Sequence, residues 1–359
     1  MISAPASPSK NHSSAALLPE LFGRETQLLG WQGISAIIPA DWNLASFAGD
    51  LDKGNFRLTD DEGLRLEVFW EKPKGTPDVE KSIALLLSNI EREAKKKKHS
   101  FEAIEKPKLI PTSRKEHADK DQLLNFGWKG DADQDVSHGW GAAWHCAGSR
   151  RVVVAHIVGR RNENGDKTRR LAAEVLSSMQ SKGVGGWQTW SAFGLQLEIP
   201  EEFQLTGAKL QTGRLEFDWQ RVRPHAPLSF ASPRDWFRRE ERIGLRRLSA
   251  ANVVLEVDSL EEWARRVAAV MFKKFRFWKW DEANVGGEKA CASRGQLKDL
   301  RRVFIGSIFD FVMRRPARPP ELLVWHNEQD NKIFVLLCDL RDVNAHVKTD
   351  LLDSLESRQ

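Results

Sequence analysis

Two stretches of the sequence, AAWHCAGSRRVVVAHIV (142–158) and LVWHNEQDNKIFVLLCD (323–339), decide the fold. Each consists of two apolar runs joined by a polar turn, which is the pattern of a β-hairpin. The number of residues from Trp144 to Trp325 is the same as the number from Leu171 to Leu352. A constant spacing across a hairpin and the segment after it predicts an internal repeat.

An earlier pair of segments supports the repeat. ISAIIPADWNL (34–44) matches LQLEIPEEFQL (195–205) without a gap, at a shorter spacing. We also expect Gly30-Trp31-Gln32 to match Gly186-Trp187-Gln188, and LRLEVFW (64–70) to match RLEFDW (214–219), so that Trp70 corresponds to Trp219. Because the spacing is larger in the later segments, we predict a basic insertion near 220–257 in the second copy.

The order of elements in each copy predicts an α+β fold, in which an antiparallel sheet carries packed helices. We expect helices at 77–98 and 166–181 in the first copy, and at 233–243, 260–275 and 343–356 in the second. The predicted organisation is a disordered tail (1–26), repeat 1 (27–182), a linker (183–186) and repeat 2 (187–357).

A strand that ends in proline and is followed by an aromatic residue opens both copies, at Pro39/Trp42 and Pro200/Phe203, and a late hairpin precedes a final helix. This arrangement resembles the PsbP-like sandwich. That family includes extrinsic photosystem II proteins, a Ran-binding import factor and bacterial secretion-effector chaperones. The resemblance covers most of residues 30–356 as two copies, and it implies a binding or scaffolding role without catalysis.

Composition restricts the class of protein. The chain has 359 residues, 41% of them hydrophobic and 29% charged, with a net charge of +5. These values are typical of a globular protein and argue against collagen, a coiled-coil rod or a wholly disordered chain. No apolar run is long enough to predict a transmembrane segment. Three unclustered cysteines, and an N-terminus without the apolar core of a signal peptide, predict a cytoplasmic protein.

The search for chemistry predicts no enzyme. Phosphate-loop, zinc-protease and nucleophile-elbow motifs do not occur in the sequence. His145 and Cys146 are neighbours on an expected strand and should point to opposite faces. The acids near Asp60 lie in a turn and are expected to be solvated. We therefore predict no catalytic residue, no metal site and no cofactor.

Arginine, lysine and aromatic residues gather in the second copy, and they are the candidate functional residues. Aromatic and arginine side chains dominate many protein interfaces, and they also bind single-stranded nucleic acid. A simpler reading is an ordinary alternating strand at 275–280. We predict a protein partner for this surface, with nucleic acid as the alternative, and the sequence leaves the oligomeric state open. The predicted partner-binding residues are Arg234, Trp236, Phe237, Arg238, Arg239, Arg242, Arg246, Arg247, Lys273, Lys274, Arg276 and Trp278.

Overall fold

The computed structural model describes residues 23–105, 107–110, 120–131, 135–161, 163–181, 186–221, 241–256, 258–298, 319–340 and 345–356. Most of the predicted tail and linker, and most of the predicted helix at 233–243, lie outside these residues. The chain divides into two compact units. Unit 1 contains Met1–Gly183, Thr189–Leu197 and Ser357–Gln359, and unit 2 contains Val184–Gln188 and Glu198–Glu356.

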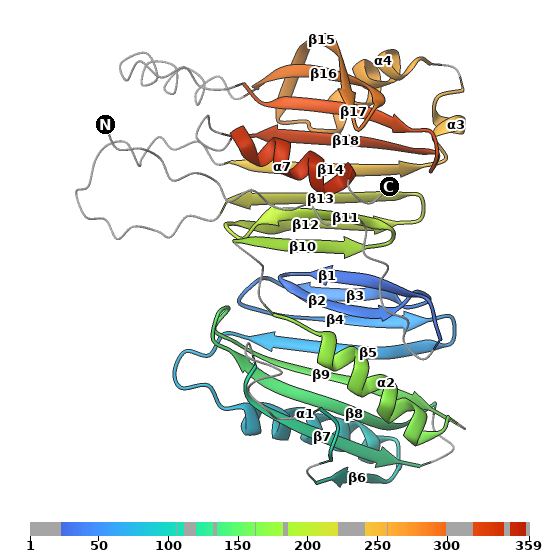
Figure 1. Cartoon of the computed structure of the whole chain (residues 1–359), viewed down its shortest axis with the longest axis vertical. Helices are drawn as coiled ribbons and strands as arrows, with labels where there is room; N and C mark the ends of the chain where they lie inside the picture. The colour runs from blue at the N-terminus through green and yellow to red at the C-terminus, as the bar shows by residue number, and fades with distance from the viewer. Residues whose placement is uncertain are drawn as a thin grey trace, which may run out of the picture. The chain divides into compact units, whose positions relative to one another are not determined.

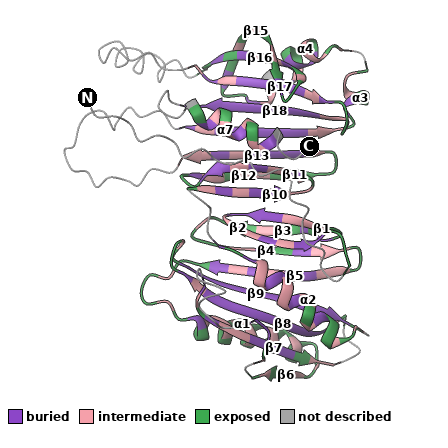
Figure 2. Cartoon of the chain, in the orientation of Figure 1, coloured by how far each residue is buried: buried purple, intermediate pink, exposed green. Residues whose placement is uncertain are grey.

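Unit 1 is built on a large antiparallel sheet with the strand order β3-β4-β5-β9-β8-β7-β6 (Figure 1). Its strands are β3 (Asn43–Gly49), β4 (Lys53–Asp60), β5 (Gly63–Glu71), β6 (Phe101–Ile104), β7 (Asp121–Gly130), β8 (Val136–Cys146) and β9 (Arg151–Arg160). The central strand β9 is buried along its whole length, as Figure 2 shows. Its run of apolar residues fits a strand that is covered on both faces.

Two helices cover this sheet. Helix α1 (Val79–Lys96) begins at the cap Asp78, whose carboxylate accepts a hydrogen bond from the backbone N–H of Lys81 at 2.8 Å. Its apolar stripe packs against β7, β8 and β9, as the sequence predicts. Helix α2 (Gly165–Ser178) packs against β8 and β9 from the other face, where Lys120 lies over the ring of Trp144 and donates to backbone carbonyls of α2.

A smaller sheet has the order β11-β10-β1-β2. Its strands are β1 (Thr26–Trp31), β2 (Ile34–Pro39), β10 (Trp187–Ala192) and β11 (Leu195–Pro200). Strands β1 and β10 pair at Gly30 and Ser191. A Cβ atom at position 30 would lie 2.5 Å from the carbonyl oxygen of Thr189, so this close approach requires glycine.

Unit 2 contains a second large antiparallel sheet, with the order β12-β13-β14-β18-β17-β16-β15. Its strands are β12 (Phe203–Gln211), β13 (Arg214–Arg221), β14 (Arg242–Ser249), β15 (Phe275–Val285), β16 (Glu288–Leu297), β17 (Glu321–Asn327) and β18 (Lys332–Asp339). The elements that precede β15 are α3 (Ala251–Val254), α4 (Leu260–Trp263), a π-helical turn η2 (Ala264–Ala268) and α5 (Ala269–Met271), and α7 (Ala345–Glu356) follows β18. The predicted helix at 260–275 therefore ends earlier than expected, because Phe275 begins a strand.

The two large sheets have the same strand order, and Trp144 and Trp325 occupy equivalent positions. Trp144 pairs with Val153 in the β8–β9 hairpin, and Trp325 pairs with Phe334 in the β17–β18 hairpin, so both pairs keep the spacing that the sequence shows. This confirms the match between the two segments that open the sequence analysis. In the part of the chain that the structure describes, the protein is thus mostly β, with three antiparallel sheets and few helices.

The match between 34–44 and 195–205 extends further toward the N-terminus than the sequence suggests. The side-chain amide of Gln27 donates to the carbonyl of Trp42 at 2.6 Å, and that of Gln188 donates to the carbonyl of Phe203 at 2.7 Å. Both β3 and β12 carry a bulge one residue after the equivalent leucine. In each copy the glutamine amide contacts the equivalent backbone carbonyl, and the bulge lies at the equivalent position. The two copies therefore share the same local geometry here.

Two of the sequence alignments are wrong. Trp70 lies on β5, whereas Trp219 lies on β13, and in the shared strand order β13 corresponds to β4. The Gly-Trp-Gln match also fails, because the tight turn that follows β1 contains Gln32 and Gly33, and the one after β10 contains Phe193 and Gly194. All four turn residues have a positive φ. Neighbouring strands carry similar apolar patterns, and this similarity explains why the sequence alignment matched the wrong strands.

The limits of the predicted insertion also need correction. Strand β13 ends at Arg221 and β14 begins at Arg242, and β14 pairs with both β13 and β18 along its length. Residues 242–249 therefore belong to the shared sheet rather than to an insertion. The chain between β13 and β14 lies outside the described residues, apart from Glu241.

Candidate partner-binding surface

A long hairpin, β15–β16, carries the candidate site in unit 2. Its turn is Gly286-Gly287, with φ values of 59° and 87°, which is the geometry of a two-residue hairpin turn. The carboxamide oxygen of Asn284 accepts a hydrogen bond from Gly287 N at 2.9 Å and closes the turn. Strand β15 is the outermost strand of the described sheet, as Figure 1 shows.

Strand β15 has an inner face that packs on the core. Phe275 is buried, and Phe277 and Trp280 pack against the same apolar cluster, which includes Trp263 and Val324. The rings of Phe275 and Phe277 lie 6.1 Å apart. The simpler sequence reading of 275–280, an alternating strand with aromatic residues inward, is therefore confirmed for these positions.

The outward face of the hairpin is basic near the start of β15. Arg276 pairs across the strands with Gln296, and Lys279 pairs with Arg294, and all four residues are exposed. Cross-strand partners share a face of the sheet, so Arg276, Lys279 and Arg294 lie together. Lys273 and Lys274, which precede β15, are exposed as well. Figure 2 shows how much of β15 is exposed.

Trp278 stands at a break in the ladder. The register shifts between Phe277 and Lys279, so Trp278 is the extra residue of a β-bulge. Its side chain is 55% exposed, which is unusual for the largest apolar residue. We call the set of Lys273, Lys274, Arg276, Trp278, Lys279 and Arg294 the basic–aromatic face.

The cations of this face have few partners within the described part of the chain. Lys279 lies 3.6 Å from Asp281 in an exposed pair. No acidic group of the described residues lies within salt-bridge distance of Arg276 or Arg294. The charges of the face therefore point into solvent, where they can meet a partner.

The structure separates the predicted partner-binding residues into three groups. Lys273, Lys274, Arg276 and Trp278 belong to the set defined as the basic–aromatic face, and all four are exposed. The predicted residues that fall outside the described part of the chain are Arg234, Trp236, Phe237, Arg238 and Arg239. Arg242, Arg246 and Arg247 lie on β14, where Arg242 is half-buried.

Arg246 and Arg247 do not fit the predicted surface, because both are buried. The guanidinium of Arg246 donates to both carboxylate oxygens of Asp218 at 2.8 Å and to the carbonyl of Phe217 at 2.6 Å, and it lies 4.7 Å from the ring centre of Phe272. Burial lowers the pKa of Arg247, and Asp330 opposes that shift. A basic segment of sequence does not reveal that its strand lies inside a sheet.

Sequence reasoning missed Arg294 as a member of the site, and Lys279 was not among the predicted partner-binding residues. Lys279 lies next to Trp278, but Arg294 is remote in sequence and reaches the face only through pairing of β15 with β16. The Gly286-Gly287 turn was the available signal. Counting back from that turn along both strands would place Arg294 near Lys279.

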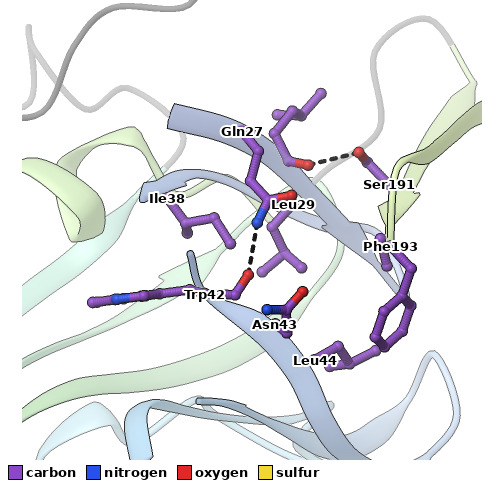
Figure 3. Close-up of a pocket in the computed structure, with 10 residues that line it drawn as sticks. Gln27, Leu29, Ile38, Trp42, Asn43, Leu44, Ser191 and Phe193 are labelled. Carbon is purple, nitrogen blue, oxygen red and sulfur yellow. Dashed lines mark hydrogen bonds between the residues drawn. The ribbon is translucent and has the colours of Figure 1, made fainter. Parts of the chain in front are cut away.

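A small pocket lies in unit 1, between β1, β2, β3 and the turn after β10 (Figure 3). It holds about 10 Å³, which is the room of one water molecule. Gln27 points into it and donates its hydrogen bond to the carbonyl of Trp42. The lining contains no acid, base or nucleophile pair, so this pocket offers no site for a substrate.

The titratable residues that the sequence singled out are engaged in structural contacts. Asp60 is nearly buried, which corrects the expectation of a solvated acid, and it forms ion pairs with Arg65 and Arg160. Burial raises the pKa of Asp60, but hydrogen bonds from Arg160 and Arg65 more than offset it and lower the pKa to about 2. His156 lies 3.1 Å from Glu67 across β5 and β9. Among the described residues, no three possible ligands gather as a metal ion requires.

Comparisons with known proteins give no family for this chain. No protein-family model matches the chain, and no curated protein matches it. A similar solved structure is the immunity protein TplEi of T6SS from Pseudomonas aeruginosa complexed with "L" peptide, with a TM-score of 0.32 and 13% identity over 93% of this chain and 97% of that one. The apo structure of TplEi has a TM-score of 0.27 and 12% identity over 93% of this chain and 95% of that one. Likeness at this level carries no argument about the site.

Within the described residues, none of the helices combines the length and the apolar composition that crossing a bilayer requires.

Proposed function

We propose that this chain is a non-catalytic interaction protein that binds a partner protein through the basic–aromatic face of unit 2. The observation that carries the proposal is Trp278, which is exposed at a bulge among cations on an outermost strand. Trp and Arg contribute strongly to binding when a partner covers them. A partner that excludes water from Trp278 and supplies carboxylates for Arg276 and Arg294 fits this face.

The inner aromatic residues favour a protein over nucleic acid. Single-stranded nucleic acid stacks its bases on several successive aromatic side chains. On β15 only Trp278 is available for stacking, because Phe275 is buried and Phe277 and Trp280 pack on the core. The face therefore offers charge and one apolar anchor, which is the composition of a protein interface.

Comparison of the two sheets points to the same strand. At the equivalent edge of unit 1, β6 has four residues, whereas β15 has eleven. Short edge strands are one way in which proteins avoid contacts with other chains. The long strand in unit 2 lacks that protection and fits a role in binding.

The proposal also concerns the origin of the two copies, the absence of catalysis and the location of the protein. The shared strand order and the matching Gln27 and Gln188 contacts support a duplication, with each copy related to the PsbP-like sandwich. The proposed role involves no catalysis. All three cysteines are free, which fits a cytoplasmic location.

Charge reversal at Lys274, Arg276 and Arg294 tests the function. Wild-type and variant proteins are used to capture material from native lysate with and without nuclease, and both protein and nucleic acid in the captured material are identified. We expect the wild-type chain to capture a partner protein even after nuclease treatment. With purified components, the affinity of the variant for this partner should be at least tenfold lower than that of wild type.

The matched control reverses Lys81, Arg92 and Lys97, three exposed cations on and beside α1 in unit 1. It makes the same change in net charge and should leave capture unchanged. Equal losses in both variants, or captured nucleic acid in place of protein, contradict the proposal.

A further inference from the structure

The outer edge of β15 is self-complementary in charge. Lys273 and Lys274 precede the strand, Arg276 and Lys279 lie in its first part, and Asp281 and Glu282 follow after Trp280. A second copy of the strand that runs antiparallel brings the basic part of one copy beside the acidic part of the other. Opposite charges at facing positions stabilise strand pairs, and like charges destabilise them.

The ladder shows which backbone groups are available for pairing. Val285 and Glu288 flank the two-residue turn, and such flanking residues form a hydrogen-bonded pair. Hydrogen-bonded and non-bonded pairs alternate along an antiparallel ladder. The backbone N–H and C=O groups of Trp280, Glu282 and Asn284 therefore point away from β16, toward the open edge.

Among the registers centred on residues 279 to 282, only the one centred on Trp280 satisfies both backbone and charge. In the register that is centred on Trp280, Lys279 of each copy faces Asp281 of the other. The register centred on Lys279 opposes two lysines, and the one centred on Asp281 opposes two aspartates. The register centred on Glu282 opposes two glutamates, so each of these alternatives is disfavoured.

We propose that β15 pairs antiparallel with β15 of a second copy of this chain, in a two-fold symmetric dimer centred on Trp280. The 3.6 Å pair of Lys279 and Asp281 within one strand is replaced by two pairs between the strands, next in sequence to the exposed Trp278. The two-fold axis runs perpendicular to the sheet, so the basic–aromatic faces of both copies lie on the same side. This inference does not rest on the identity of any other partner.

Strand edges alone bury less area than a permanent interface, so the dimer is weak and depends on concentration. We expect sedimentation velocity on the purified full chain to show a monomer–dimer equilibrium with a Kd of about 10–500 μM. A chain that remains monomeric up to about 1 mM overturns the proposal.

Charge swapping tests the register. Lys279→Glu places a carboxylate opposite Asp281 twice in each dimer, and we expect the Kd to rise about tenfold or more. The double variant Lys279→Asp with Asp281→Lys restores opposite charges and should return the Kd to within about threefold of wild type. A single variant that dimerises normally, or a double variant that stays monomeric, overturns the proposal.

A second pair of variants tests the backbone contact. Glu282→Pro removes an N–H that faces the open edge, where proline is tolerated, and Glu282→Val removes the same carboxylate but keeps the N–H. We expect the proline variant to be monomeric and the valine variant to dimerise. Melting curves establish that both variants fold, and equal dimerisation of both contradicts strand pairing.

These measurements use no other protein, and they leave Lys274, Arg276 and Arg294 unchanged. Failure of dimerisation and failure of partner binding are therefore read from different variants and different assays.

Discussion

Arg151 offers the sharpest test of how unit 1 is held together. It is 4% exposed at the start of β9, and its guanidinium donates to four backbone carbonyls. The acceptors at 2.7 and 2.8 Å are those of Gln32 and Ser181, and those at 3.3 Å are Gly33 and Leu51. One side chain thus joins the β1–β2 turn, the loop after β3 and the segment that follows α2.

Arg151→Met keeps much of the aliphatic volume but removes all four hydrogen bonds. A hydrogen bond from a charged group contributes about 1.5–3 kcal/mol, and a buried acceptor without a partner costs about 1–3 kcal/mol. The two longer bonds are weaker, and solvent can reach part of the loop. We therefore expect a loss of about 3–5 kcal/mol, most of it from the two shorter hydrogen bonds.

The free energy of unfolding is measured by urea denaturation followed by circular dichroism. At about 2–4 °C per kcal/mol, the same loss lowers the Tm by about 6–20 °C. Arg161→Met, at an exposed position just after β9, is the control and should change stability by less than about 0.5 kcal/mol. A loss below about 1 kcal/mol for Arg151→Met would refute the assignment of Arg151 as a buried clamp.

Two further predictions concern unit 1. Because the pKa of Asp60 is about 2 in the folded protein against 3.8 ordinarily, its contribution to stability is present above pH 3.8 and is lost as the pH falls toward 2. The free energy of unfolding, measured as the pH is lowered, should fall by about 2 kcal/mol in wild type and should not show this loss in Asp60→Asn. Equal acid sensitivity of the two proteins would count against this role of Asp60. Gly30→Ala should cost about 1–3 kcal/mol, because its Cβ meets the backbone of Thr189, whereas Gly75→Ala has open space and should be neutral or slightly stabilising. Thermal melting compares these two variants, and equal Tm values would contradict the close approach of β1 and β10.

Local patterns predicted several elements correctly. The apolar stripe of 77–98 predicted α1, whose Asp78 cap and half-buried stripe the structure shows. The repeated Trp-His pair predicted two equivalent hairpins, and Trp144 and Trp325 do occupy the same place. These predictions succeeded because helix periodicity, capping and hairpin turns depend on residues that are close in sequence.

Predictions that needed long-range pairing were less successful. Trp70 was matched to Trp219, although β5 corresponds to β14 and not to β13. Arg246 and Arg247 were assigned to a surface, but β14 lies between β13 and β18 and buries both. Strand alternation shows which residues share a face, but it does not show how many strands lie beside them.

The sequence by itself predicted two similar arrangements of strands and helices, and it showed that basic and aromatic residues are concentrated in the second. Only the tertiary structure decided that β14 is internal, that β15 is outermost and that a bulge exposes Trp278. It also brought Arg294 beside Lys279. The physical reason is that side-chain direction follows the local strand period, whereas position within a sheet depends on hydrogen bonds between segments that are far apart in the chain.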